Sequence, residues 1–468
     1  MEERDVVIIG GGPAGYAAAI RVSQLGGKAA LIENETLGGT CLNSGCIPTR
    51  ALARAVELFD MGKDANDYGI TYNNISVDFA KMMARKNIVV KTLVAGVKLL
   101  LNANKVELIE GAGRFLSPSQ IEVRLKDKTK KTLRARRVII ATGSRCKEMS
   151  VQGGEARIIN TTQALGLTEL PQSMLIVGGG FVGITFATIF SKLGATVSIV
   201  EESSRILPQI DSEIVAILER ELKSSRIRTY TDARILNIKD GKDGNLHVEI
   251  NGKGQPVTVS TQYVLMAEAR EANIDDLHLQ EAGIRLNEKA GIAVNTKMET
   301  NISTILAAGD VTMEHMWTPV AYVEGIIAAD NTMGLNKEVD YSAVPYWIST
   351  VPEISSVGMT EEEAIARGYT IQVGRFPFAA NGMATILGQR TGMVKIIVDE
   401  RYHQILGVHI VGPGATDLIA GAALAIRLDV TPEDIGATLH AHPSLSEAIW
   451  EAARDVNGEA LHFLTQRR

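Results

Sequence analysis

The stretch VVIIGGGPAG at residues 6–15 decides the fold, because a cluster of glycines joins an apolar strand to the start of a helix. The helical pattern runs to about Leu25, and a second apolar strand ends on Glu33. The same device returns as LIVGGGFVG at residues 175–183, and the strand after its helix ends on Glu201. In both copies the glutamate stands 18 positions after the last glycine of the cluster. This shared interval predicts two copies of one strand–turn–helix–strand unit.

Each copy has the features of a site for the pyrophosphate of a dinucleotide. A buried parallel strand feeds a helix whose first N–H groups and dipole attract negative charge. The glycines permit a tight turn and close approach of the backbone to phosphate, and the glutamate can hold both ribose hydroxyls. A simple glycine-rich turn is the alternative for one copy, but it does not explain two complete copies. The expected site residues are Gly10, Gly12, Gly15 and Glu33 in the first copy and Gly178, Gly180, Gly183 and Glu201 in the second.

The second copy is expected to prefer NAD to NADP. Glu201 would repel the 2′-phosphate of NADP, and no arginine follows it immediately. Arg205 stands four residues further on and keeps NADP as the weaker alternative.

The length of 468 residues indicates two or three domains rather than one core. Segments 137–144 and 304–310 have the pattern of strands that return to the first unit, and the second of them ends on Asp310. From about Tyr341 the pattern changes to strand-like runs followed by amphipathic helices. We predict an α/β fold of two Rossmann-like dinucleotide-binding domains and a C-terminal α+β domain, divided at residues 1–150, 151–270, 271–340 and 341–468.

The composition excludes several classes of partner. The net charge is −6 and the charges are dispersed, so no nucleic-acid-binding surface is expected. Glycines or charges interrupt the most apolar stretches, so no membrane span is expected. The N-terminus lacks the order of a secretory signal, which favours a cytoplasmic protein. In that compartment a close cysteine pair more often serves catalysis, metal binding or redox sensing than structure.

The segment GGTCLNSGCIPTR at residues 38–50 predicts a redox-active pair, Cys41 and Cys46. Residues five apart in a regular helix rise about 7.5 Å and lie on different faces. A disulfide needs Cα atoms within about 7 Å, so the turn must be distorted, and Gly45 supplies that freedom. Pro48 suits the first turn of the helix that follows. The N–H groups at that helix start would lower the pKa of a thiol, as redox chemistry requires.

Two other interpretations of the cysteines are weaker. A zinc site needs further ligands, and neither a C-x-x-C nor a clustered Cys/His motif occurs in the sequence. Two inert buried thiols are the second alternative. Cys146 stands alone on a different strand and turn, and we expect it to be a small, partly buried residue.

On these residues the chain resembles the dihydrolipoamide dehydrogenase branch of the flavoprotein disulfide reductases. The likeness covers nearly the whole chain, through GGGPAG, the cysteine segment, ATGS at residues 141–144, AAGD at 307–310 and HAHPSLSEA at 440–448. It implies FAD on the first unit, NAD on the second, and a homodimer formed through the C-terminal domain. It implies a lipoyl-carrying protein as substrate, whose dithiol reduces the cysteine pair, with Cys46 nearer the flavin. Further cofactor-binding residues that the resemblance implies are Gly39, Thr40, Arg50, Gly113, Thr142, Gly143, Ala269, Asp310 and Thr318.

His442 and Glu447 are the expected acid–base pair. Thiol–disulfide exchange needs a group that takes a proton near neutral pH, and a carboxylate would orient the imidazole. In the family this histidine reaches the disulfide of the other subunit. The alternative is structural, because Ser444 and Glu447 have the spacing of a capping box that would place Glu447 at the third helical position. His440 fits a supporting hydrogen bond.

Four departures from the family pattern lie on the nicotinamide side of the flavin. Arg50 and Thr185 stand where relatives carry the Lys–Glu ion pair beside flavin N5, so Arg50 is expected to lack its carboxylate partner. Residues 267–273 depart from Gly-Arg-x-Pro-Asn and include the acidic Glu268, and Thr318 with the following proline replaces Ala-His. We hypothesise that dithiol–disulfide chemistry is kept while exchange with NAD is slowed or altered. The alternative, with equal weight, is that these substitutions are neutral for catalysis and change only the electronic properties of the flavin slightly.

Three rival functions follow from the same fold. Mercuric reductase usually carries a C-terminal vicinal cysteine pair, and this C-terminus has none. Glutathione-type reductases favour NADP, against Glu201, although another low-molecular-weight disulfide stays open as substrate. The third is a flavin electron-transfer subunit with an acceptor other than NAD. The presence of all four expected catalytic residues, Cys41, Cys46, His442 and Glu447, argues against a protein without any catalytic activity.

Overall fold

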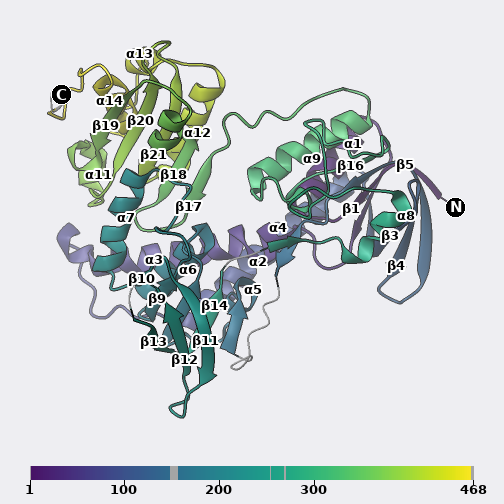
Figure 1. Ribbon diagram of the computed structural model, residues 1–468, viewed down its shortest axis with the longest axis horizontal. Coiled ribbons are helices and arrows are strands. Elements are labelled where there is room, and N and C mark those ends of the chain that lie inside the picture. Colours follow the sequence, from purple (N-terminus) through teal and green to yellow (C-terminus); the bar gives the residue numbers. More distant parts are fainter. Residues whose placement is uncertain (1, 148–156, 253–254, 268–269, 465–468) are drawn as a thin grey trace.

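The structure, a computed structural model, describes residues 2–147, 157–252, 255–267 and 270–464 (Figure 1). Within these residues the chain forms three parts. The first and second units are built around the two glycine motifs, and the C-terminal part has a sheet of its own. In Figure 1 the first unit lies at the right, the second unit below, and the C-terminal part at the upper left. The predicted α/β fold with a C-terminal α+β part is confirmed.

The first unit is a six-stranded sheet in which β1 pairs in parallel with both β2 and β5. Its outer parallel strands are β3 beside β2 and β16 beside β5, and β4 joins antiparallel to β3 and β5. The pairing of β16 brings Asp310 to the carboxyl edge of the sheet. The strands are β1 (Glu2–Ile9), β2 (Ala29–Glu33), β3 (Glu107–Ser117), β4 (Gln120–Leu125), β5 (Lys130–Ile140) and β16 (Ile305–Ala307).

Helices cover both faces of this sheet because apolar side chains alternate along its buried strands. One core joins α1, α4 and α9 to the sheet, and a second core joins the opposite face to α8. α1 and α9 pack very closely, since a Cβ added to Gly325 of α9 would lie 2.2 Å from the carbonyl oxygen of Ala14. The helices are α1 (Pro13–Gln24), α4 (Phe79–Ala103), α8 (Leu279–Ala282) and α9 (Thr318–Thr332).

The glycine motifs have the same backbone geometry in both units. Gly10 and Gly178 have φ angles of 104° and 107°, in the left-handed region that favours glycine. A Cβ on Gly15 would lie 1.8 Å from the carbonyl oxygen of Gly10, and a Cβ on Gly183 would lie 1.9 Å from that of Gly178. Only glycine therefore permits this contact between each helix and the turn before it.

The second unit has a five-stranded parallel sheet of order β10-β9-β8-β14-β7 and a separate antiparallel sheet of order β11-β12-β13. Strand β6 (Ser144–Cys146) pairs antiparallel with β15 (Arg270–Ala272) where the chain passes between the two units. The remaining elements are β7 (Ile158–Asn160), α5 (Thr161–Ala164), β8 (Ser173–Val177), α6 (Phe181–Lys192), β9 (Thr196–Val200), α7 (Ser212–Ser224), β10 (Arg228–Tyr230), β11 (Arg234–Asp240), β12 (Leu246–Asn251), β13 (Val257–Thr261) and β14 (Tyr263–Met266).

The C-terminal part is an antiparallel sheet of order β17-β18-β21-β20-β19. Helix α12 packs on β18 and β21, and α14 packs on β19 and β20. Among the residues that the structure describes, no helix is long and apolar enough to cross a membrane. The elements are β17 (Tyr346–Ile348), β18 (Ile354–Gly358), α10 (Glu361–Ala366), β19 (Ile371–Pro377), α11 (Gly382–Ile386), β20 (Met393–Asp399), β21 (Ile405–Val411), α12 (Ala415–Arg427), α13 (Pro432–Ala437) and α14 (Glu447–Asp455).

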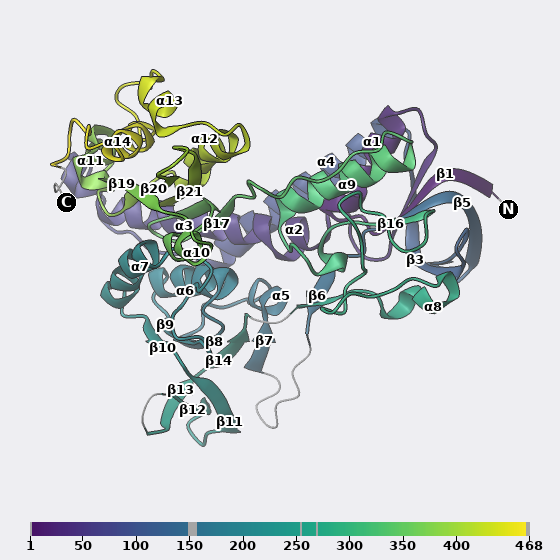
Figure 2. The same cartoon turned by 45° about the horizontal axis from the view of Figure 1, so that its top comes forward.

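Two features join the C-terminal part to the rest. Helix α3 (Cys46–Lys63) runs between the second unit and the C-terminal part in both views (Figures 1 and 2). Lys395 of β20 is buried against the N-cap of α7, with its Nζ 2.8 Å from a carboxylate oxygen of Asp211 and 2.7 Å from Glu361. A buried ion pair is stabilising only when hydrogen bonds satisfy both charges, and these contacts do so.

Candidate active site

A cavity of about 2120 Å³ lies where the three parts meet, and residues of both glycine motifs line it. The predicted residues that line it are Gly10, Gly12, Glu33, Gly39, Thr40, Cys41, Cys46, Arg50, Gly113, Thr142, Gly143, Gly180, Glu201, Asp310 and Thr318. Gly15, Gly178 and Gly183 instead form the helix-to-turn contacts behind the lining. His442 and Glu447 do not line the cavity, and Ala269 and Glu268 lie outside the described residues.

The two glutamates that end the second strand of each unit are held in the same way. The N–H groups of Gly11 and Gly179 each donate to Oε2 of Glu33 and Glu201, respectively, at 2.7 Å. The backbone N–H two residues after each glutamate donates to the other carboxylate oxygen, at 2.6 and 2.7 Å. Burial raises the pKa of Glu33, and the backbone hydrogen bonds oppose that shift. Both carboxylates are thus fixed at the cavity wall.

The guanidinium of Arg205, which could have bound the 2′-phosphate of NADP, is held by its own loop. It donates to the carbonyl oxygens of Ile210 and Pro208, at 2.8 and 2.9 Å. The arginine that kept NADP as an alternative is therefore bound to its own loop.

The cysteine segment forms two helices that Gly45 separates. α2 (Gly39–Ser44) carries Cys41 in its middle, and α3 begins at Cys46. Gly45 has φ −136° and ψ −112°, which breaks the helical path between the two cysteines. Both thiols are free in this structure; Cys41 is buried and Cys46 is exposed to the cavity. The distorted turn predicted at Gly45 is present.

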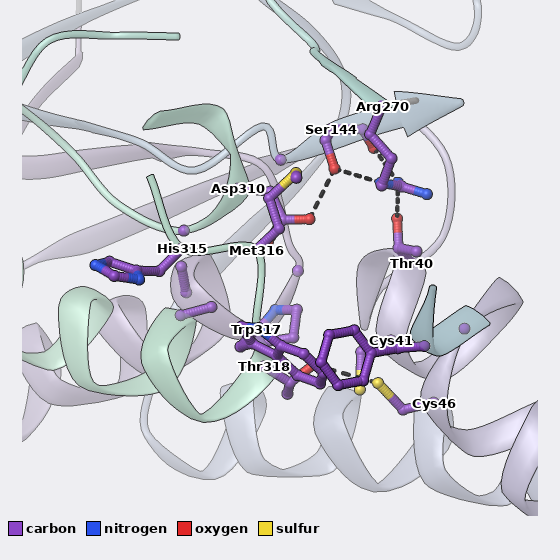
Figure 3. Close-up of a pocket in the computed structure, with 18 of the residues that line it drawn as sticks. Thr40, Cys41, Cys46, Ser144, Arg270, Asp310, His315, Met316, Trp317 and Thr318 are labelled. Atoms are coloured by element: carbon purple, nitrogen blue, oxygen red, sulfur yellow. Dashed lines mark hydrogen bonds between the residues drawn. The ribbon is translucent and has the colours of Figure 1, made fainter. Parts of the chain in front are cut away.

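The cavity-facing thiol is the acidic one of the pair. A hydrogen bond with Cys41 lowers the pKa of Cys46 to about 6, against the opposing effect of burial, and Thr318 lowers it further. Thr318 Oγ1 lies 3.3 Å from Cys46 Sγ (Figure 3). The same hydrogen bond raises the pKa of Cys41. Cys46 is therefore the thiol of the pair that ionises more readily, at the N-terminus of α3 where a thiolate is favoured.

Arg270 connects α2, the helix that carries Cys41, to strand β6, and sequence reasoning did not single it out. Its Nε donates to Ser144 Oγ at 2.7 Å, and its Nη2 lies 3.4 Å from Thr40 Oγ1 (Figure 3). Ser144 Oγ in turn donates to Asp310 Oδ2 at 2.7 Å. Arg270 occupies the arginine position of the altered Gly-Arg-x-Pro-Asn pattern, which was the signal for it.

The usual carboxylate partner is absent at position 185, as expected, but Arg50 pairs with a carboxylate from another part of the chain. Arg50 Nη2 lies 2.5 Å from Oε1 of Glu353, just before β18, and Nη1 donates to Ser349 Oγ at 3.2 Å. Although burial opposes its charge, Glu353 raises the pKa of Arg50. Glu353 is 303 residues from Arg50 in the chain, and no local pattern links them.

Thr185 is buried and does not replace the missing glutamate. Its Oγ1 donates to the carbonyl oxygen of Phe181, one turn back in α6, at 2.8 Å. Beside it, aromatic rings from all three parts of the chain meet around Trp317, whose ring centroid is 4.9 Å from Phe181 and 5.1 Å from Tyr346. Trp347 adds a third ring at 5.3 Å. These aromatic residues line the same cavity, and sequence reasoning missed them.

His442 and Glu447 form a pair on the surface of the C-terminal part. His442 Nδ1 donates to Glu447 Oε1 at 2.8 Å, and its side chain is 80% exposed. Partial burial opposes the ionisation of Glu447, but hydrogen bonds from His442 and from the Ser444 N–H lower its pKa. Half of the predicted capping box is present, because the Ser444 N–H donates to Glu447 Oε2 at 2.8 Å. The other half is missing, because α14 begins at Glu447 and Ser444 Oγ contacts Ser446 Oγ. His440 Nδ1 donates to the Thr438 carbonyl oxygen at 3.1 Å.

The lining of the first unit fits a flavin dinucleotide. Thr142 Oγ1 is buried but has no hydrogen-bond partner among the described residues, so it can serve a bound group. Space is open in front of the motif, since a Cβ on Gly12 would meet nothing closer than 3.8 Å and one on Gly143 would meet nothing within 4 Å. The first N–H groups of α1 face this space and favour a pyrophosphate.

The sequence and structure resemble several known proteins. Residues 4–325 match the pyridine nucleotide-disulphide oxidoreductase family, and residues 344–453 match its dimerisation domain. A dihydrolipoyl dehydrogenase of Bacillus subtilis is 41% identical over 98% of this chain and 99% of that protein. A leghemoglobin reductase of Vigna unguiculata is 38% identical over 97% and 87%. The Cu(II) complex of the HOCl-induced flavoprotein disulfide reductase RclA from Escherichia coli superposes with a TM-score of 0.87 and 27% identity, over 97% of this chain and 99% of that one.

Proposed function

The chain belongs to the pyridine nucleotide-disulphide oxidoreductase family, and on this basis we propose that it oxidises the dithiol of a lipoyl-carrying protein and reduces NAD⁺. Its enzymatic class is that of the FAD- and NAD-dependent disulfide oxidoreductases. The observation that carries the proposal is the Cys41–Cys46 pair, whose acidic thiol faces a cavity shared by two dinucleotide motifs.

In the proposed assignment, residues 1–150 and 271–340 bind FAD, residues 151–270 bind NAD, and residues 341–468 form a dimer. When bound, FAD accepts two electrons from the dithiol form of the cysteine pair and passes a hydride to NAD⁺. The residues that would hold FAD are Gly10, Gly12, Gly15, Glu33, Gly39, Thr40, Arg50, Gly113, Thr142, Gly143, Asp310 and Thr318. Gly178, Gly180, Gly183, Glu201 and Ala269 would hold NAD.

The cysteines carry the exchange in two displacements. A substrate thiolate attacks Cys41 Sγ of the oxidised pair, the Cys41–Cys46 bond breaks, and Cys46 leaves as a thiolate. The second substrate thiol then attacks the substrate sulfur of the mixed disulfide and releases Cys41. The substrate becomes a disulfide and the cysteine pair gains its two electrons. The low pKa of Cys46 makes it the better leaving group in the first displacement.

His442 supplies the acid–base step in this scheme, and it does so from a second copy of the chain. The imidazole takes the proton of the incoming thiol and returns one to Cys41, while Glu447 orients the ring. Because the pair does not line the cavity of its own chain and His442 is 80% exposed, a second chain must bring it to the cysteines. The match of residues 344–453 to a dimerisation domain supports this arrangement.

A non-NAD acceptor is the second candidate, and the nicotinamide side of the cavity favours it. Thr185 offers no charge, Arg50 is paired with Glu353, and an aromatic cluster replaces polar contacts there. These features support slower or altered exchange with NAD while the cysteine side is unchanged.

A steady-state assay tests the proposed function. Dihydrolipoamide, a protein-bound lipoyl domain and reduced glutathione are compared as donors, each with NAD⁺, NADP⁺ and an artificial acceptor. We expect lipoyl dithiols to be oxidised, NAD⁺ to be preferred to NADP⁺, and the artificial acceptor to be reduced faster than NAD⁺. Cys41→Ser abolishes lipoyl turnover in this account, whereas Cys146→Ser, in the same cavity, retains it. Oxidation of glutathione alone would contradict the proposal, and NAD⁺ reduction as fast as the artificial acceptor would exclude the second candidate.

A further inference from the structure

We propose that Glu353 is a positioning residue that holds Arg50 and neutralises its charge beside Cys46, so that the C-terminal part sets the stability of the Cys46 thiolate. This inference rests on the proposed function, because it concerns the thiol that carries electrons in the same cavity. Glu353 lies just before β18, in a different part of the chain from the cysteine helices.

Arg50 stands one helical turn after Cys46 in α3. The two residues stand four apart in α3, so their side chains lie on one face of the helix, and both line the cavity. A free guanidinium there would favour the thiolate, as a nearby cation does for any anionic group. In the structure the guanidinium is instead directed to Glu353 Oε1 at 2.5 Å and to Ser349 Oγ at 3.2 Å.

Glu353 is a fixed acceptor rather than a mobile surface carboxylate. Its side chain is 13% exposed, and its second oxygen, Oε2, accepts the N–H of Thr416 at 3.1 Å. Its own carbonyl oxygen accepts the N–H of Gly412 at 2.8 Å. Among the described residues, the only other carboxylate oxygen within 4 Å of the Arg50 guanidinium belongs to Glu57, 3.9 Å away on the same helix. Glu353 therefore determines where the guanidinium lies and how much of its charge is compensated.

The other charged groups around the two side chains do not replace this contact. Cys46 faces Cys41, Asp310, Thr318 and Tyr322, and Arg50 faces Glu57 and Asp417 in addition to Glu353. The negative charge of Asp310 raises the pKa of Cys46 and so disfavours its thiolate. Removal of the Glu353 charge would leave Arg50 less compensated and the thiolate more stable. Removal of the Arg50 charge would leave Glu353 uncompensated and the thiolate less stable.

The test is the rate of alkylation of Cys46 by iodoacetamide as a function of pH. It uses the Cys41→Ser holoenzyme, in which Cys46 is the only thiol of the pair, and peptide mapping separates its product from that of Cys146. At pH 5, Glu353→Gln is expected to speed alkylation of Cys46 about threefold to tenfold. Arg50→Gln is expected to slow it by about threefold.

Glu57→Gln is the matched control, because it makes the same chemical change in the more distant carboxylate of Arg50. Its effect on the alkylation rate is expected to stay below about twofold. A Glu353→Gln rate equal to that of Glu57→Gln would overturn the proposal, as would a lowered melting temperature with an unchanged rate. If Glu353→Gln does not fold, Glu353→Asp, which shortens the reach to Arg50, must shift the rate in the same direction, and an unchanged rate overturns the proposal.

This measurement is independent of substrate and nicotinamide. A protein that fails to oxidise dihydrolipoamide would contradict the proposed function, yet its Cys46 alkylation would still report on Glu353. Conversely, a normal lipoyl oxidase with no response to Glu353→Gln would contradict only the inference about Glu353.

Discussion

Thr318→Val removes the hydroxyl that lies 3.3 Å from Cys46 Sγ and keeps the shape of the side chain. A hydrogen bond to a charged group contributes about 1.5–3 kcal/mol, and we take about 1.4 kcal/mol for this long contact to sulfur. That value is tenfold in the ionisation constant, so the pKa of Cys46 should rise from about 6 to about 7. At pH 6 the fraction of Cys46 in the thiolate form would fall from about one half to about one tenth.

The assay is the pH titration of the long-wavelength charge-transfer band between the Cys46 thiolate and bound FAD in the two-electron-reduced enzyme. Because a group with a lowered pKa is ionised above that pKa, the band should disappear as the pH falls, and it should do so at a higher pH in Thr318→Val. Thr185→Val is the matched control, since that hydroxyl bonds to its own helix in the same cavity. An unchanged midpoint in Thr318→Val, or an equal shift in Thr185→Val, would show that the Thr318 hydroxyl does not stabilise the Cys46 thiolate.

Three further predictions follow from contacts elsewhere in the molecule. Lys395→Met leaves the buried Asp211 carboxylate without its partner and should lower the free energy of unfolding, measured by urea denaturation, by about 3–5 kcal/mol. A loss below about 1 kcal/mol would contradict a stabilising role for this ion pair. Gly183→Ala places a Cβ 1.9 Å from the carbonyl oxygen of Gly178, so NAD binding measured by calorimetry should be lost while Cys41 and Cys46 still exchange with dithiols. His442→Gln should slow reduction by dihydrolipoamide about 10²- to 10⁴-fold in stopped-flow measurements, with flavin reduction by NADH unchanged; equal slowing of both reactions would argue against an acid–base role.

The parts of the site that the sequence could predict are those fixed by neighbours in the chain. The interval from glycine cluster to glutamate sets one turn, one helix and one strand, so Glu33 and Glu201 receive the same backbone hydrogen bonds. The break at Gly45 between Cys41 and Cys46 is also a local property of the backbone.

The remaining contacts depend on how distant segments pack. Arg50 meets Glu353 only because the C-terminal part docks beside α3, and no periodicity reports a contact across 303 residues. The aromatic cluster around Trp317 draws on three parts of the chain in the same way. Only half of the capping box predicted at Glu447 is present, because Glu447 Oε2 accepts from the Ser444 N–H but the helix starts later than the motif suggests.

An anaerobic titration of the FAD-loaded protein with dihydrolipoamide tests whether Cys41 and Cys46 carry the electrons from the substrate to the flavin. We expect one equivalent of dithiol to produce the charge-transfer band of the Cys46 thiolate, Cys46→Ser to abolish the band, and Cys146→Ser to leave it intact. Flavin bleaching without that band, or a band that persists in Cys46→Ser, would contradict the claim that Cys41 and Cys46 carry the electrons.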